Sequence, residues 1–178
     1  MSTHGLRTSE AARYIAAKLN PLGYDVYYDH GKKGEFVGKI AVSIEEKLSR
    51  ENELSQMDIA IIKREPKKLI ALVEIEETTN NPKKLIGDIF AVLMGDFIHL
   101  PGGTQVVMGD KTTLIILGKG EDHKIRNERL LKLADRAKSA LGTVNSKIVK
   151  IVIESIGEKN NLEELLMKKV DEAIRKNA

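Results

Sequence analysis

The sequence predicts an α/β protein in which a mixed sheet, with antiparallel strands at its centre, is flanked by helices. Segments with apolar residues at every third or fourth position alternate along the chain with short runs rich in Ile, Val and Leu. Two of these runs follow each other closely across a charged turn and are therefore expected to form a hairpin. The 178 residues suffice for one domain with a sizeable core.

The N-terminal part of the chain is predicted to contain a helix, a strand and a second helix. Thr8–Leu19 has its apolar residues on one side and hydroxyl side chains at its start that can cap a helix. Tyr24–Tyr28 has the pattern of a strand, and Asp29–Gly34 is a flexible basic loop. Lys39–Leu48 is predicted to be a helix because large apolar residues recur at every fourth position. Arg50–Leu54 is expected to be a polar connector.

The central part of the chain is predicted to be a hairpin followed by a helix. Ile59–Ile62 and Leu69–Glu76 are its strands. Pro82–Leu93 is predicted to be a helix because Asn-Pro is a typical helix start, and Asp88 is expected at its surface. The expected buried stripe of this helix consists of Leu85, Ile86, Ile89, Phe90 and Leu93.

The remaining elements continue the alternation of strands and helices. A turn at Gly109-Asp110 is predicted to join two strands as a hairpin. The predicted strands are Thr104–Val107, Thr112–Leu117 and Lys147–Ile153, and the predicted helices are Asn127–Leu141 and Asn161–Ile174.

Three carboxylates lie where the apolar pattern predicts core strands. Asp58 comes just before the first strand of the hairpin, and Glu74 and Glu76 end the second. Carboxylates are rarely buried without a partner, because an unpaired buried charge is costly. Since side chains alternate across a strand, Glu74 and Glu76 are expected to share a face with Ile70 and Leu72.

The length of the hairpin turn decides whether these carboxylates converge. An odd-numbered turn, for example Glu65–Lys67, places Asp58 opposite Glu74, whereas an even-numbered turn places it opposite Ile75 unless a bulge corrects the register. In the first case the carboxylates come within about 5–8 Å of one another and need a divalent cation or a shared proton. An all-oxygen site suits Mg²⁺. Alternatively, Glu74, Glu76 and Glu77 are the polar end of a strand running into solvent, and Asp58 caps the start of its partner.

Basic residues near the hairpin are candidates for contacts with phosphate groups. The net charge of +3 permits nucleic-acid binding without requiring it. Two lysines in the first turn of the helix after the hairpin oppose the helix dipole, which favours a nearby anion such as phosphate. For the first loop, simple solvation is the alternative. The candidates are Lys32 and Lys33 in the first loop, Lys63, Lys67 and Lys68 around the hairpin turn, and Lys83 and Lys84 on the helix.

Asp58, followed by Glu74-Ile75-Glu76 on the next strand, resembles the signature of the PD-(D/E)xK nuclease superfamily, which includes type II restriction endonucleases, Holliday-junction resolvases and repair nucleases. That core runs helix, three strands, helix, strand, which is similar to the predicted order. The resemblance covers roughly residues 8–118 and implies a restriction endonuclease-like single domain over residues 1–178, with a C-terminal strand and helices at about 119–178. Glu10 occupies the place of a further glutamate that several members carry on the first helix.

The sequence departs from the signature at two positions. Met57 replaces proline, which is a minor variation, and Glu76 replaces lysine. Some restriction enzymes resemble this sequence in carrying Glu-x-Glu. Without an ammonium group at that position, a second metal ion or Glu76 itself would have to activate the attacking water. Either Lys83 or Lys84 could supply the missing charge.

The resemblance implies an endonuclease that cuts DNA phosphodiester bonds as a homodimer, with Mg²⁺, or Mn²⁺ in its place, as cofactor. Asp58 and Glu74 would hold the metal with the main-chain carbonyl of Ile75. Glu76 would be a second ligand or the base, and Glu10 an outer or second-metal ligand. The alternatives are an inactive nucleic-acid-binding protein of the same fold and a protein-interaction domain with solvated acidic residues.

The composition places further limits on the expected function. No run of about 18 apolar residues and no signal-peptide pattern occurs, so no membrane association is expected. The absence of cysteine agrees with a cytoplasmic protein. The histidines His4, His30, His99 and His123 are scattered and are expected at the surface or in loops rather than as ligands.

Overall fold

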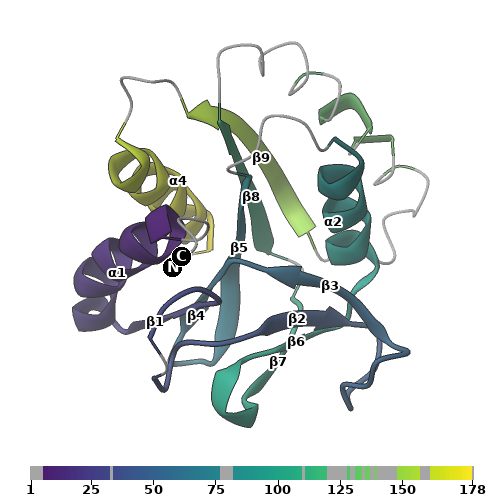
Figure 1. Ribbon diagram of the computed structural model, residues 1–178, viewed down its shortest axis with the longest axis horizontal. Helices are drawn as coiled ribbons and strands as arrows, with labels where there is room; N and C mark the ends of the chain where they lie inside the picture. Colours follow the sequence, from purple (N-terminus) through teal and green to yellow (C-terminus); the bar gives the residue numbers. More distant parts are fainter. Residues whose placement is uncertain are drawn as a thin grey trace.

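The computed structural model describes residues 6–32, 34–76, 82–109, 111–119, 148–156 and 161–177, and a few positions between 128 and 139. The elements form layers around a central sheet, as Figure 1 shows. Helices α1 (Leu6–Leu19) and α4 (Leu162–Asn177) cover one face, while α2 (Pro82–Met94) and a second, smaller sheet lie against the other. The predicted α/β fold class is confirmed.

The central sheet has five strands in the order β1-β4-β5-β8-β9. β4 pairs antiparallel with β1 and β5, whereas β8 pairs parallel with β5 and β9, so the sheet is mixed as predicted. Strands in parallel sheets are usually buried on both faces, and β5 is accordingly buried from its second residue to its last. The strands are β1 (Tyr24–Tyr28), β4 (Ile59–Lys63), β5 (Lys68–Glu76), β8 (Thr112–Lys119) and β9 (Ile148–Ile156).

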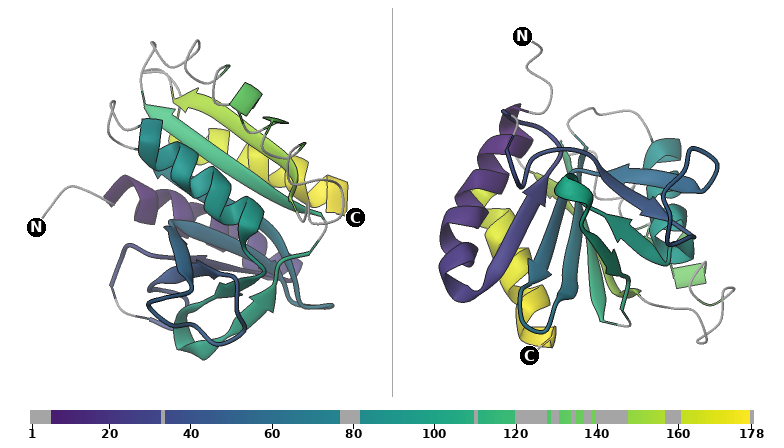
Figure 2. Two further views of the ribbon diagram at one scale, coloured as in Figure 1. Left: turned by 90° about the vertical axis from the view of Figure 1, so that its right-hand side faces the viewer. Right: turned by 90° about the horizontal axis from the view of Figure 1, so that it is seen from below.

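The second sheet consists of four short antiparallel strands in the order β3-β2-β6-β7. Both views in Figure 2 show it on the same side of the central sheet as α2. Its apolar side chains form one core with α2 and the facing side of the central sheet. The strands are β2 (Ile40–Ser43), β3 (Glu53–Met57), β6 (Phe97–His99) and β7 (Gln105–Val107).

This second sheet corrects three predictions. Lys39–Leu48 is not a helix, because β3 and β6 flank β2 and all four residues of β2 are buried. The apolar spacing of such a segment cannot distinguish a buried strand from a helix, and Ile44, which a helix would have buried, is exposed. The connector expected at Arg50–Leu54 becomes β3 from Glu53 onward. The hairpin predicted at Gly109-Asp110 is also wrong, since β7 pairs with β6 and β8 with β5.

Helix α2 agrees with its prediction in extent but not at every position. Leu85, Ile89 and Leu93 are buried as predicted, whereas Phe90 is 43% exposed. Asp88, expected at the surface, is only 6% exposed.

The other helices begin and end close to their predicted positions. α1 begins two residues earlier than predicted and ends at the predicted residue. The N–H of Glu163 at the start of α4 donates to Oδ1 of Asn161 at 3.0 Å, which caps the helix. The helix predicted at Asn127–Leu141 falls largely outside the described residues. Within the described part of the chain, no helix is long and apolar enough to cross a membrane.

A β-bulge sets the register between β4 and β5. The turn comprises four residues, 64–67, and the register then shifts so that Ile70 is an extra residue in β5. The last pair of this ladder is Ile59 with Val73, so Asp58 and Glu74 lie just beyond it on adjacent strands. The hairpin therefore combines an even-numbered turn with a correcting bulge. The bulge also moves Ile70 to the face opposite Glu74, in the core beneath α1 and α4, against the prediction.

Candidate active site

A pocket of about 200 Å³ lies at the end of the central sheet where β5 finishes and where α1 and α2 begin. It gathers side chains from segments that are far apart in the sequence. The lining residues are Thr8, Asp29, His30, Gln56, Met57, Asp58, Glu74, Ile75, Glu76 and Lys84.

Asp58 lies between β3 and β4, next to the last pair of β4 with β5. Its Oδ2 accepts a hydrogen bond from the N–H of Ile75 at 2.7 Å. Its own N–H donates to the carbonyl of Val73 at 3.1 Å. Since the N–H and C=O of a strand residue point towards the same neighbour, the carbonyl of Ile75 also faces the side of Asp58.

Glu74 is almost fully buried, at 2% exposure, and pairs with Lys84 from α2. The Nζ of Lys84 lies 2.7 Å from Oε1 of Glu74 and 3.8 Å from Oε2 of Glu76. The structure thus brings a lysine to these carboxylates from a neighbouring helix, which is one of the two positions that the sequence suggested. The side chain of the other, Lys83, lies outside the described residues.

His30 lines the pocket, although the sequence predicted it only as part of a basic loop and not as a ligand. It follows β1, and its Nε2 lies 3.6 Å from Oδ1 of Asp58. The N–H of Asp29 donates to the carbonyl of Asp58 at 2.9 Å and so holds the loop beside the acid. The sequence places His30 two residues after the predicted strand Tyr24–Tyr28. It does not show that this strand pairs with β4, and it is this pairing that brings His30 close to Asp58.

Asp88 is a second residue that sequence reasoning missed. It lies one helical turn after Lys84, and its Oδ1 accepts a hydrogen bond from the hydroxyl of Ser55 on β3 at 2.5 Å. Its Oδ2 is buried and accepts no hydrogen bond within the described residues. No local signal could have indicated this burial, because it results from the packing of β3 against α2.

Burial dominates the electrostatics of the carboxylates. It raises the pKa of Glu74 to about 8, with a further contribution from the charge of Asp58. It also raises the pKa of Asp58 to about 6, although the N–H of Ile75, His30 and Lys84 act in the opposite direction. Burial lowers the pKa of Lys84, but its contacts with Glu74 and Glu76 outweigh this effect and raise it above its usual value. The ammonium group therefore favours the ionised form of Glu74.

The pocket offers oxygen ligands of the kind that Mg²⁺ prefers. In residues for which the structure gives a placement, no three His, Cys, Asp or Glu side chains form a group that could hold a metal ion. However, Mg²⁺ usually takes only one or two carboxylates and keeps several waters, and Asp58 and Glu74 meet that smaller requirement. Oε2 of Glu74 is buried and accepts no hydrogen bond from the described residues. A cation beside it would favour the ionised carboxylate that burial disfavours.

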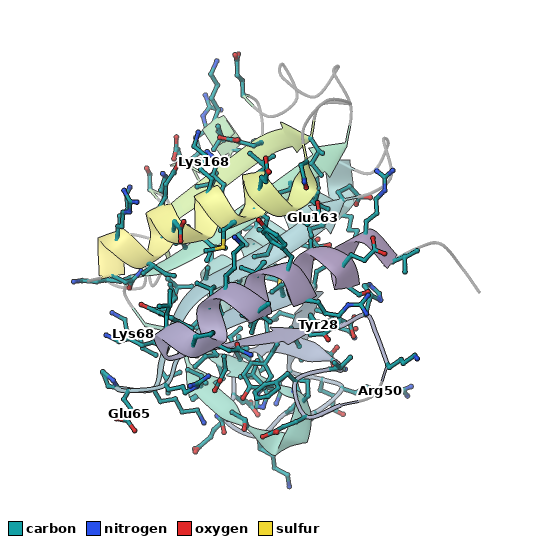
Figure 3. The ribbon with its side chains drawn as sticks, turned by 90° about the vertical axis from the view of Figure 1, so that its left-hand side faces the viewer. Tyr28, Arg50, Glu65, Lys68, Glu163 and Lys168 are labelled. Carbon is teal, nitrogen blue, oxygen red and sulfur yellow. The ribbon has the colours of Figure 1, made fainter. Side chains whose placement is uncertain are left out.

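The hairpin lysines lie away from this pocket. Lys63, Lys67 and Lys68 are at the turn, and six residues of extended strand, about 20 Å, separate Lys68 from Glu74. In Figure 3, Glu65 and Lys68 lie at one side of the molecule and Tyr28, close to the pocket, lies towards the other.

Of the other candidates, Lys32 is near the pocket and Glu10 is not among its lining residues. Glu10 is exposed on α1, and Thr8 is the residue of that helix that lines the pocket. Lys32 is exposed in the loop that carries His30, and Lys33 lies outside the described residues.

No protein-family model, no curated protein and no solved structure matches this chain. The interpretation of the pocket therefore depends on its geometry and on the resemblance of its acidic residues to the nuclease signature.

Proposed function

We propose that the protein is a Mg²⁺-dependent nuclease that hydrolyses phosphodiester bonds in DNA at the pocket around Asp58 and Glu74. The contact between Lys84 and Glu74 carries the proposal. It supplies, from α2, the ammonium group that the lysine of the signature would provide and that Glu76 does not. Two acids and a lysine around one pocket are the combination that the resemblance implies, and DNA as the substrate rests on the resemblance.

Each residue of the pocket would have a distinct role. Asp58 and Glu74, with the carbonyl of Ile75, would hold the metal ion, which when bound neutralises phosphate charge and acidifies water. Lys84, whose side chain is 49% exposed, would donate hydrogen bonds to the scissile phosphate. Glu76 is buried within 3.8 Å of the same ammonium group and would accept the proton of the attacking water.

The test is cleavage of supercoiled, linear and branched DNA in the presence of Mg²⁺ or Mn²⁺. Glu74→Gln keeps the size of the side chain and an oxygen that can accept from Lys84, but it removes the charge. Glu164→Gln is the matched control, because Glu164 is an exposed carboxylate on α4, outside the pocket. We expect the wild type and the control to cut DNA equally and Glu74→Gln to lose at least roughly 100-fold in rate, as is usual for loss of a charged catalytic group.

The other outcomes separate the alternatives. Equal cleavage by the wild type and by Glu74→Gln would contradict the proposal. Salt-sensitive DNA binding without cleavage by any variant would support an inactive nucleic-acid-binding protein. Absence of both binding and cleavage would support a protein-interaction domain.

A further inference from the structure

A second hollow adjoins the proposed active site along β3. Its volume is about 520 Å³, and it shares Gln56 and Lys84 with the active-site pocket, so the two hollows meet at these side chains. The first four residues of β3 line this outer hollow, and the strand, which is five residues long or about 17 Å when extended, runs towards Asp58. One strand of a DNA duplex advances only about 3.4 Å per nucleotide along the axis. The outer hollow therefore extends over more than one nucleotide from the proposed point of cleavage.

The charges in this hollow favour an anion. Three cationic side chains, those of Lys39, Arg50 and Lys84, line it together with two carboxylates. Both carboxylates already have partners, since Glu53 forms an ion pair with Lys39 and Asp88 accepts from a serine hydroxyl.

Arg50 is the most available of these cations. It is exposed, lies at the edge of the molecule in Figure 3, and forms no ion pair within the described residues. A guanidinium group binds phosphate oxygens in a bidentate manner. Lys39 is paired with Glu53 at the surface, and its side chain is still 45% exposed, so its ammonium group can also contact a phosphate while it stays beside Glu53.

We propose that the outer hollow binds a phosphate group of the nucleic acid beyond the scissile phosphate on the same path, through Arg50 and Lys39. This inference rests on the proposed function, because it takes the carboxylate pocket as the place of cleavage. It gives the nucleic acid a direction across the protein, along β3 and away from Asp58. In this proposal Arg50 and Lys39 are the phosphate contacts closest to the site. The lysines of the hairpin turn, which the sequence suggested, lie at the other end of β5.

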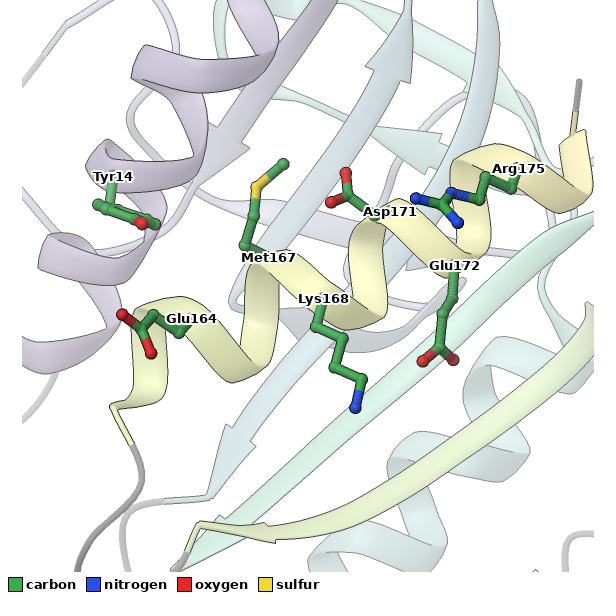
Figure 4. A pocket seen from close by; sticks show the side chains of 7 residues that line it. All are labelled: Tyr14, Glu164, Met167, Lys168, Asp171, Glu172 and Arg175. Atoms are coloured by element: carbon green, nitrogen blue, oxygen red, sulfur yellow. The ribbon is translucent and has the colours of Figure 1, made fainter.

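The test compares two double variants that remove the same charge from two different hollows. Lys39→Gln/Arg50→Gln changes the proposed subsite. Lys168→Gln/Arg175→Gln is the control, because these two exposed residues of α4 line a hollow of about 470 Å³ between α1 and α4, which Figure 4 shows together with its acidic residues. Binding of a fluorescent oligonucleotide duplex is measured by anisotropy over a range of salt concentrations, without divalent metal so that no strand is cut.

We expect the subsite variant to bind at least about 10-fold more weakly and to lose about two from the slope of log K against log salt, since each phosphate contact contributes about 0.9. Arg50→Gln alone should lose about half of that slope. The control should bind like the wild type. Equal weakening of both double variants, or of neither, would overturn the proposal.

Cleavage in Mg²⁺ separates this inference from the proposed function. Cleavage by the wild type, combined with unchanged binding by the subsite variant, would refute the subsite alone. Absence of cleavage by the wild type, combined with binding loss confined to the subsite variant, would refute the nuclease and leave the phosphate-binding hollow established.

Discussion

Replacing Lys84 by methionine would remove the cation that Glu74 and Glu76 share while keeping most of the apolar length of the side chain. The wild-type ammonium group lies 2.7 Å from Oε1 of Glu74 and 3.8 Å from Oε2 of Glu76. Both carboxylates are buried, so without Lys84 neither would retain the cation that now faces it. We expect Lys84→Met to be less stable than the wild type, and we expect the loss to depend on pH.

The magnitude follows from the position of the pair. Coulomb's law at an effective dielectric constant of about 20 gives roughly 6 kcal/mol at 2.7 Å. Desolvation of Glu74, and the 49% exposure of the lysine side chain, reduce this figure. Loss of one partner costs about 3–5 kcal/mol for a buried pair and about 0–1 kcal/mol for an exposed one. We therefore expect a loss of about 2 kcal/mol when Glu74 is ionised, which corresponds to roughly 4–8 °C in Tm.

The pH dependence has a definite sign. Burial raises the pKa of Glu74 in the folded protein to about 8, and removal of Lys84 would raise it further. Below about pH 4.5 the carboxyl group of Glu74 is protonated in both the folded and the unfolded state. Its interaction with Lys84 then contributes nothing to the difference in stability between Lys84→Met and the wild type. The loss should therefore be small at about pH 6 and should appear as the pH rises through about 8.

Urea unfolding followed by circular dichroism at about pH 6 and about pH 9 measures this difference. Lys168→Met, at an exposed position on α4, is the control and should be neutral at both pH values. A loss of equal size at both pH values, or no loss at about pH 9, would show that Lys84 does not neutralise Glu74.

Three further predictions concern single residues. His30 lowers the pKa of Asp58, so His30→Gln should shift the acidic limb of the pH–rate profile for the proposed DNA cleavage to higher pH. An unchanged limb would exclude Asp58 as the group that titrates there. Burial raises the pKa of Asp88, which favours the folded state at low pH and costs stability as the pH rises. Asp88→Asn should therefore gain stability relative to the wild type between about pH 4 and about pH 8 in urea unfolding, and a constant difference would contradict this reasoning. At Gly95 a Cβ atom would lie 2.3 Å from a valine methyl carbon, so Gly95→Ala should lower the free energy of unfolding by about 1–3 kcal/mol. Gly87 is exposed on α2 and has nothing within 4 Å of such an atom, so Gly87→Ala should raise it by about 0.5–1 kcal/mol. Thermal unfolding of the two variants tests both signs.

The hairpin and the helix after it could be predicted from the sequence because their signals are local. Continuous runs of apolar residues define β4 and most of β5, and a proline after asparagine marks the start of α2. The relation of Asp58 to Glu74 was predictable as one of two alternatives, because the face of a strand residue depends only on register. The turn length and the bulge decide between these two alternatives, and neither could be predicted from the pattern of apolar and polar residues.

Other features depend on contacts between segments that are distant in sequence. β2 is buried because β3 and β6 flank it, and neither flanking strand has a strong pattern of its own. His30 and Lys84 reach the carboxylates because β1 pairs with β4 and because α2 packs over the face of β5 that carries Glu74. Asp88 is buried by β3. In each case the burial or position of the residue is determined by a contact with a segment that is distant in the sequence.

The packing of α4 against α1, β5 and β8 has a consequence for synthesis of the protein on the ribosome. The apolar residues beneath these helices, among them Val73 and Ile115, belong to one core that includes side chains from both α1 and α4. More than eighty residues separate the end of β5 at Glu76 from the start of α4 at Leu162, and translation of such a segment takes on the order of ten seconds. During that interval the nascent chain would expose the apolar part of the sheet that α4 later covers, because no other described element packs there in its place.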